Sequence, residues 1–305
     1  LDERDIRTAT IAGMAGFFSA LFGTPLAAAI FAMAVISVGL LYHAALIPSL
    51  FSSLTAYGLS RLFGIEPVHY AVAAPEVGVF MFFRVVLLAA FCALVSSLFC
   101  DVLHHMEAAM RRWFPNSFLR AAVGGVALIL LSLLFPVDYN GTGTGVIRLA
   151  VEEGTAHPLA FLLKILFTSV TLSAGFKGGE VVPSFFIGAT FGCAAGPLLG
   201  IPAGFAAAVG LIAVFCGAVN CPIASTFLAI ELFGSEGVLY FAIACAVSFV
   251  LSGYNGLYSS QRILYDKLKA QFIDVHTNAY REGQKPLEAI PVPHVKDAAA
   301  DSGSK

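Results

Sequence analysis

Long apolar segments alternate with short polar breaks along the chain, and glycine or proline stands at many of the breaks. The apolar segments cover residues 9–22, 25–42, 44–60, 78–103, 119–135, 159–174, 181–199, 203–219, 221–233 and 236–253. Several are shorter than the roughly 20 residues that a helix needs to cross a bilayer. Helices that stop inside a membrane leave free N–H or C=O groups, which only protein or a polar cavity can satisfy. Broken helices of this kind point to an ion site near the bilayer midplane, so the pattern predicts an all-α integral membrane transporter or channel.

Composition supports this class. Of the 305 residues, 58% are hydrophobic and 12% are charged, and the mean hydropathy is +0.86. Five of the 36 charges lie in residues 1–7 and thirteen in 262–305, which leaves eighteen for the 254 residues between. Such a stretch is too apolar for one water-soluble core of that size. A cytosolic enzyme and a disulfide-stapled secreted domain are therefore excluded, and the net charge of −2 offers no basic patch for nucleic acid.

The positive charges orient the chain in the bilayer. Arginines cluster between Met110 and Arg120, and Arg and Lys follow Ser260, so both regions should face the cytoplasm. The loop from Arg61 to Glu76 should face outward, and segment 78–103 then crosses as one long helix. Arg84 lies near its outer end, where it either snorkels to the interface or contributes to ion conduction.

Two domains are predicted. Residues 1–272 should form the transmembrane domain, and residues 273–305 are polar and typical of a disordered cytoplasmic tail.

Cysteine and histidine suggest no metal site and no cofactor. All six cysteines lie in apolar runs without a CxxC pair, so buried free thiols are predicted. His104 and His105 follow a long apolar segment and should mark its polar end rather than bind a metal. HExxH and GxSxG motifs are absent, and the GTGTG run lacks the spacing of a nucleotide loop, which argues against an intramembrane enzyme.

The sequence contains an internal repeat. At an offset of 197 residues, segment 13–35 aligns with segment 210–232, with five identities that include a proline between two helical runs. Duplicated halves are common in transport folds. Glu231 in the second copy has Ala34 in the corresponding place. An acid at membrane depth is a functional candidate, although capping of a neighbouring helix or a subunit contact explains it equally well.

The strongest local signal is GFKGGEVVPSFFIGATFG, residues 175–192. Gly178 and Gly179 permit a tight turn and close approach of a ligand, and Pro183 suits the first turn of a following helix. The backbone N–H groups of Glu180, Val181 and Val182 should then point out of the helix start and bind an anion.

Lys177 adds a positive charge near this helix start and would help to attract the anion as the charge of the selectivity filter. The alternative is a plain glycine turn in which Lys177 and Glu180 form an ion pair.

These motifs resemble the CLC family of chloride channels and proton-coupled anion exchangers. Segment 175–192 is similar to the family's filter segment, GTPLAAAIF and NCPIASTFLAIE to its paired proline-containing helices, and YNGTGTGVI to a glycine-rich link. GYNGLYSS (253–260) is similar to the start of the family's last helix, whose tyrosine hydroxyl contacts the central anion; by position this is Tyr258. The resemblance covers about residues 10–270. It implies an inverted repeat of tilted and broken helices in a homodimer, with residues near 25–60 and 221–253 at the dimer interface.

The departures from the family pattern concern proton coupling. Val181 stands where the family usually has Phe, and Glu180 resembles the fluoride-exporting branch, in which Thr commonly stands where this chain has Val182. Ala34 and Val35 stand where many exchangers keep an internal proton-accepting glutamate. No GxEGP segment with its gating glutamate occurs, so the resemblance implies an N-terminally truncated unit with an incomplete first repeat.

The predicted function is therefore transport of a small inorganic anion, chloride or another halide, across the lipid bilayer, by a channel or a proton-coupled exchanger. A fluoride/proton antiporter, with Glu180 as the proton carrier, is one alternative. A cation-coupled secondary transporter is another, which the absence of an Asp/Glu cage for Na⁺ argues against.

Overall fold

The computed structural model describes residues 3–268 and 272–277 and is built almost wholly of helices. The helices are α1 (Glu3–Phe22), α2 (Pro25–Ala34), α3 (Leu46–Leu62), α4 (Val79–Trp113), α5 (Ser117–Leu134), α6 (Thr144–Arg148), α7 (Ala160–Ser173), α8 (Val181–Ala195), α9 (Ala203–Val219), α10 (Pro222–Phe233) and α11 (Val238–Leu251). Short helical turns lie at η1 (His43–Ala45), η2 (Val137–Tyr139), η3 (Leu149–Glu153) and η4 (Pro197–Leu199). Each predicted apolar segment overlaps one helix of ten or more residues, so the prediction of an all-α protein is confirmed.

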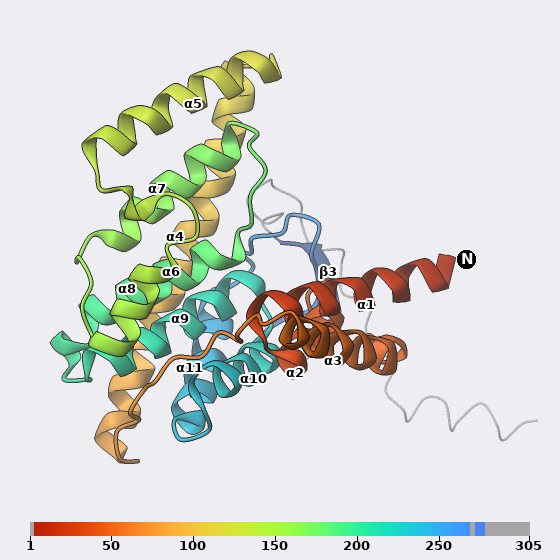
Figure 1. Ribbon diagram of the computed structural model, residues 1–305, viewed down its shortest axis with the longest axis vertical. Helices are drawn as coiled ribbons and strands as arrows, with labels where there is room; N and C mark the ends of the chain where they lie inside the picture. The colour runs from red at the N-terminus through yellow and green to blue at the C-terminus, as the bar shows by residue number, and fades with distance from the viewer. Residues whose placement is uncertain (1–2, 269–271, 278–305) are drawn as a thin grey trace, which may run out of the picture.

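Helix length separates two groups of helices. Among the described residues, α4 and α5 are long and apolar enough to cross a membrane. Six other apolar helices are shorter: α2, α7, α8, α9, α10 and α11. Figure 1 shows α4 running the length of one side of the molecule, with α5 at one end beyond α7. The short helices are the broken elements that the glycine and proline positions predicted.

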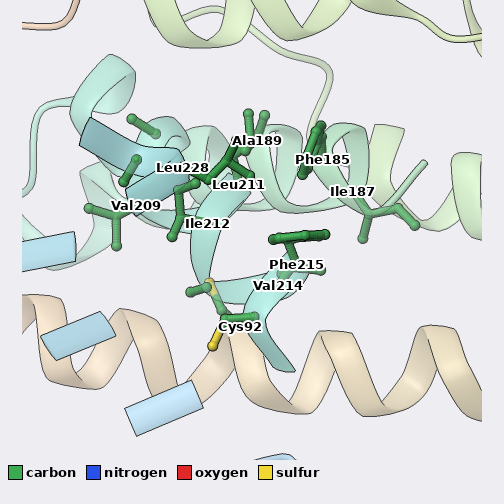
Figure 2. Packing of buried hydrophobic residues seen from close by; sticks show 14 of the residues in the cluster. Cys92, Phe185, Ile187, Ala189, Val209, Leu211, Ile212, Val214, Phe215 and Leu228 are labelled. Atoms are coloured by element: carbon green, nitrogen blue, oxygen red, sulfur yellow. The ribbon is translucent and has the colours of Figure 1, made fainter. Parts of the chain in front are cut away.

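The core forms where α9 is enclosed by its neighbours. Helix α9 packs on α8, α4 and α11, and all of its residues from Phe205 to Val219 are buried. Figure 2 shows apolar side chains of α8 and α9 meeting there, with Cys92 of α4 below them. A Cβ added at Gly188 or Gly192 of α8 would collide with backbone carbonyls of α9. Glycine at these two positions therefore allows α8 and α9 to pack closely. This close packing fixes the position of α8, including its first turn.

The predicted repeat has a structural counterpart at two helix breaks. The α1–α2 break has φ +71° at Gly23 and φ/ψ of −122°/75° at Thr24. The α9–α10 break has φ +59° at Asn220 and φ/ψ of −124°/72° at Cys221. In both, proline follows as the first helical residue, because its missing N–H has no partner to lose there. The two aligned segments thus adopt the same backbone path.

A small sheet near the end of the chain departs from the sequence analysis. Strand β1 (Ser37–Val38) pairs in parallel with β2 (Arg262–Tyr265), which pairs antiparallel with β3 (Phe272–His276). Residues 253–260 form turns and irregular chain before β2, so the prediction that GYNGLYSS begins a helix is wrong. The backbone hydrogen bonds of β2 go to β1 and β3 instead. The predicted tail boundary at 273 falls inside β3, and residues 278–305 lie outside the described part of the chain.

Candidate functional site

The start of α8 leaves two backbone donors open. Glu180 is the N-cap residue, and the Ser184 N–H bonds to its carbonyl oxygen at 3.2 Å. Pro183 has no N–H, and the N–H groups of Val181 and Val182 have no acceptor within the described chain. Because the helix dipole adds positive potential at this end, the arrangement suits an anion.

Another helix start in the same protein has its donors satisfied. At α2, whose first residue is also proline, Glu231 accepts hydrogen bonds from the N–H groups of Leu26 and Ala27, both at 2.9 Å. Glu231 is therefore a cap for a neighbouring helix, one of the structural alternatives raised for it. A carboxylate of the protein therefore occupies the α2 start, whereas no side chain among the described residues caps the α8 start.

A cavity of about 330 Å³ lies beside the α8 start. It brings Tyr258 together with Lys177, Gly178 and Glu180, which lie about 80 residues earlier in the sequence. Its remaining lining residues are Leu103, His104, Glu107, Leu172, Phe176, Leu257, Ser259 and Ser260. Gly179, Val181 and Val182, which the sequence analysis also placed at the anion site, are not among the lining residues of this cavity.

The ion-pair interpretation of Glu180 is not supported. Lys177 is exposed, and no salt bridge joins it to Glu180 among the described residues. Glu180 is half-buried, and its Oε2 atom is buried without a hydrogen-bond partner. A buried carboxylate oxygen without a partner is costly unless a proton or a bound donor satisfies it. The Oε2 atom of Glu180 is thus open to a proton or to a donor bound at the site.

Tyr258 is held by backbone contacts on both sides. The N–H of Leu257 bonds to the Ala218 carbonyl at the end of α9, at 2.9 Å. The Tyr258 carbonyl accepts from the Gln261 N–H at 3.0 Å and from the Thr277 hydroxyl at 2.5 Å. Tyr258 also lines a second cavity of about 250 Å³, together with Met14, Phe31, Val35, Ile36, Ser260 and Gln261. The tyrosine therefore lines two cavities from a backbone that hydrogen bonds hold in place.

Two polar side chains tie the segment after Tyr258 to helix ends. The Gln261 side-chain amide donates to the Val35 carbonyl, just after α2, at 2.7 Å and to the carbonyl of Val219, the last residue of α9, at 2.9 Å. The Lys267 ammonium donates to the Phe249 carbonyl and to Asn220 Oδ1, at 2.8 and 2.5 Å. The carbonyls of Val35, Val219 and Phe249 lie at or near helix C-termini, where carbonyls lack intrahelical partners. The segment that carries Tyr258 is thereby fixed to three helices.

Two further basic side chains donate hydrogen bonds to backbone carbonyls. Arg84 donates to the Gly200 carbonyl at 3.0 Å, in the turn after α8. The buried Lys164 of α7 donates to the carbonyls of Tyr139 and Gly141, at 3.1 and 2.6 Å, and its Nζ lies 5.0 Å from the Phe186 ring centroid. Lys164 therefore anchors the glycine-rich link, a role that the sequence analysis did not predict.

The sequence analysis also missed the contribution of α4. This helix continues to Trp113, so His104 and His105 lie within it rather than after it. His104 and Glu107 line the cavity, which could have been suspected from their spacing of three residues on one helix face. The six cysteines are free and buried as predicted, and the described residues contain no cluster of three or more metal-ligating side chains.

Comparison with known proteins places these features in context. The family profile described as "Voltage gated chloride channel" matches residues 1–253. The chain is 37% identical over 275 residues to the "Chloride/fluoride channel protein" of Pseudomonas syringae pv. tomato, a match that covers 88% of this chain. It is 27% identical over 249 residues to an uncharacterized protein of Methanocaldococcus jannaschii, covering 80% of this chain. The matches span 61% and 62% of the length of these two relatives.

Solved structures give the same picture. A CLC-type fluoride/proton antiporter matches with a TM-score of 0.81 at 34% identity, covering 83% of this chain and 65% of its own. A slow cyanobacterial Cl⁻/H⁺ antiporter matches with a TM-score of 0.68 at 20% identity, covering 83% of this chain and 62% of its own. The second likeness concerns the fold alone.

Proposed function

The chain belongs to the voltage-gated chloride channel family, and from this we propose that it moves a small halide ion across a lipid bilayer, with Glu180 carrying a proton in exchange. Members of this family are integral membrane proteins, and we place this chain in the cell membrane as a multi-pass protein.

The observation that carries the proposal is the single cavity shared by Glu180 and Tyr258 at the open start of α8. The Val181 and Val182 N–H groups and the Tyr258 hydroxyl are the donors for the anion. A charged Glu180 beside the anion would repel it, because two like charges a few ångströms apart in a low-dielectric site cost several kcal/mol. Protonation of Glu180 removes this repulsion, which couples proton uptake to anion entry.

Fluoride is the ion that we favour over chloride. Glu180 in the GGEV segment and the 34% identity to a fluoride/proton antiporter support this choice. Fluoride is smaller than chloride and so accepts stronger hydrogen bonds from the same donors. Val182 offers no hydroxyl where the fluoride branch commonly has Thr, so the proton should reach Glu180 by another route.

The test is ion efflux from liposomes that contain the full-length protein and are loaded with fluoride or chloride. An entrapped pH dye reports proton movement in the same vesicles. We expect fluoride efflux to exceed chloride efflux and to drive proton uptake. Efflux of neither halide above protein-free liposomes would refute the proposal, and fluoride efflux without proton movement would refute the coupling.

Tyr258 provides a separate test of the anion site. Its hydroxyl should donate to a partly dehydrated anion, a hydrogen bond worth about 1.5–3 kcal/mol. Tyr258→Phe should therefore weaken anion binding about 10- to 150-fold, as measured by calorimetry, with the unfolding midpoint little changed. Unaltered binding by a folded variant would remove Tyr258 from the site.

We also propose that the protein is a homodimer through α2, α3, α10 and α11. Helix α3 carries Ile47, Phe51 and Leu54 with 73%, 74% and 52% of their surface exposed. Helices α10 and α11 add Ile223 and Leu239, which are also more than half exposed. Light scattering in a mild detergent should give the mass of a dimer, and a monodisperse monomer would contradict this arrangement.

A further inference from the structure

Two titratable side chains of α4 face the same cavity as Glu180. His104 and Glu107 are three residues apart, about 4.5 Å along the helix axis, and both line the cavity beside Glu180 and Tyr258. Helix α4 ends among the arginines that mark the cytoplasmic side, with Glu107 nearer to that end than His104. The order of the side chains thus leads from cytoplasmic water toward Glu180.

The two side chains differ in how exposed they are. The Glu107 side chain is 42% exposed and is paired at 2.5 Å with Arg111, whose side chain is 67% exposed. Glu107 therefore lies at the surface of the described chain, near the end of α4 that carries the arginines. His104 is half-buried, with its Nδ1 2.6 Å from the Cys100 carbonyl oxygen. Because a carbonyl only accepts, Nδ1 carries a proton and Nε2 is the nitrogen that exchanges one.

We propose that Glu107 and His104 form the proton relay that connects cytoplasmic water with Glu180. This rests on the proposed function, since it assumes that Glu180 exchanges a proton. The Glu107 carboxylate takes a proton from water and passes it to Nε2 of neutral His104, which becomes an imidazolium. The imidazolium releases that proton to the Glu180 carboxylate through water in the cavity. His104 returns to neutrality, Glu107 to its charged form, and Glu180 becomes neutral.

Charges around the cavity are compatible with this sequence. Arg111 pairs with Glu107 and offsets its charge, and Lys177 lies at the cavity wall. Tyr258 is the remaining titratable group among the lining residues. A permanent negative charge at the entrance would otherwise oppose anion passage, whereas the paired Glu107 can hold a proton briefly without excluding the anion.

His105 offers a matched control for His104. Its Nδ1 makes the same contact one residue further along, at 2.7 Å from the Asp101 carbonyl oxygen, but His105 is exposed and does not line the cavity. We therefore compare His104→Gln with His105→Gln in liposomes that contain the full-length protein, with fluoride as the driving anion. His104→Gln should lose anion-driven proton uptake while fluoride efflux continues, and His105→Gln should behave as the wild type. Equal proton uptake by the two variants would overturn the role of His104.

Chemical rescue and a second residue keep the test independent of folding. Imidazole added to the side that carries the arginines should restore proton uptake to His104→Ala. Glu107→Gln should slow proton uptake, and Glu107→Asp should restore it, because only the second variant keeps a carboxylate. Normal proton uptake by both His104→Gln and Glu107→Gln would overturn the relay and leave the proposed function intact. A wild-type protein that moves fluoride without protons would overturn the relay together with the coupling.

Discussion

Removal of the Glu231 carboxylate should destabilise the fold, because this group satisfies the open N–H groups in the first turn of α2. Pro25 at the first position has no N–H, and the next two donors, Leu26 and Ala27, bond to the two oxygens of Glu231 at 2.9 Å each. Hydrogen bonds to a charged group contribute about 1.5–3 kcal/mol each, which gives about 3–6 kcal/mol for the pair. Leu26 is 45% exposed, so water or lipid headgroups replace part of its bond. We expect Glu231→Ala to lower the free energy of unfolding by about 3 kcal/mol.

The assay is equilibrium unfolding in mixed detergent micelles, followed by circular dichroism. Glu231→Gln should lose about half as much, because its amide keeps one acceptor oxygen but no charge. Glu236→Ala is the matched control, since Glu236 is exposed in the turn after α10. A Glu231→Ala variant as stable as Glu236→Ala would refute the capping role and make a role of Glu231 in transport the better explanation.

Two other substitutions test contacts of buried helices. Ala34 corresponds to Glu231 in the repeat and lines a cavity of about 440 Å³ at the start of α10. Ala34→Glu should therefore place a carboxylate at the start of α10, as Glu231 does at the start of α2. We expect an unfolding free energy unchanged or raised by about 0.5–2 kcal/mol, the range of a helix cap, and a large loss would contradict the equivalence of the two helix breaks. Lys164→Met should lower the free energy of unfolding in detergent by about 1–3 kcal/mol, because the carbonyl of the buried Tyr139 is left without its donor, and a melting temperature equal to that of the wild type would refute the anchoring role.

The sequence predicted the elements that depend on local chemistry. Pro25 and Pro222 marked helix starts, because proline at a first helical position loses no hydrogen bond. The Gly178–Gly179 pair followed by Pro183 located the start of α8 to the residue. These signals lie within a few positions of each other along the chain, so they are visible without the fold.

Features that depend on contacts between distant segments were not predicted. The Gln261 side chain donates to the carbonyls of Val35 and Val219, which are 226 and 42 residues away. No local sequence pattern predicts a hydrogen bond over such a separation. His104 and His105 were predicted to mark the polar end of a membrane helix, because the apolar segment was expected to end at residue 103. The helix instead continues to Trp113, which places His104 and Glu107 on one face of it. The Lys177–Glu180 pair was a reasonable interpretation of two charges three residues apart, but residues 175–179 are not helical. Without a helix, that spacing does not place the two side chains on one face.

Anion-driven proton uptake by Glu180→Gln tests the central claim most directly. Glutamine keeps the size of the side chain and its position at the α8 start but cannot carry an exchangeable proton on a carboxylate. In liposomes with the full-length protein, we predict that the variant still releases fluoride while an entrapped pH dye records no coupled proton uptake. Proton uptake at the wild-type rate by a well-folded Glu180→Gln protein would contradict the account.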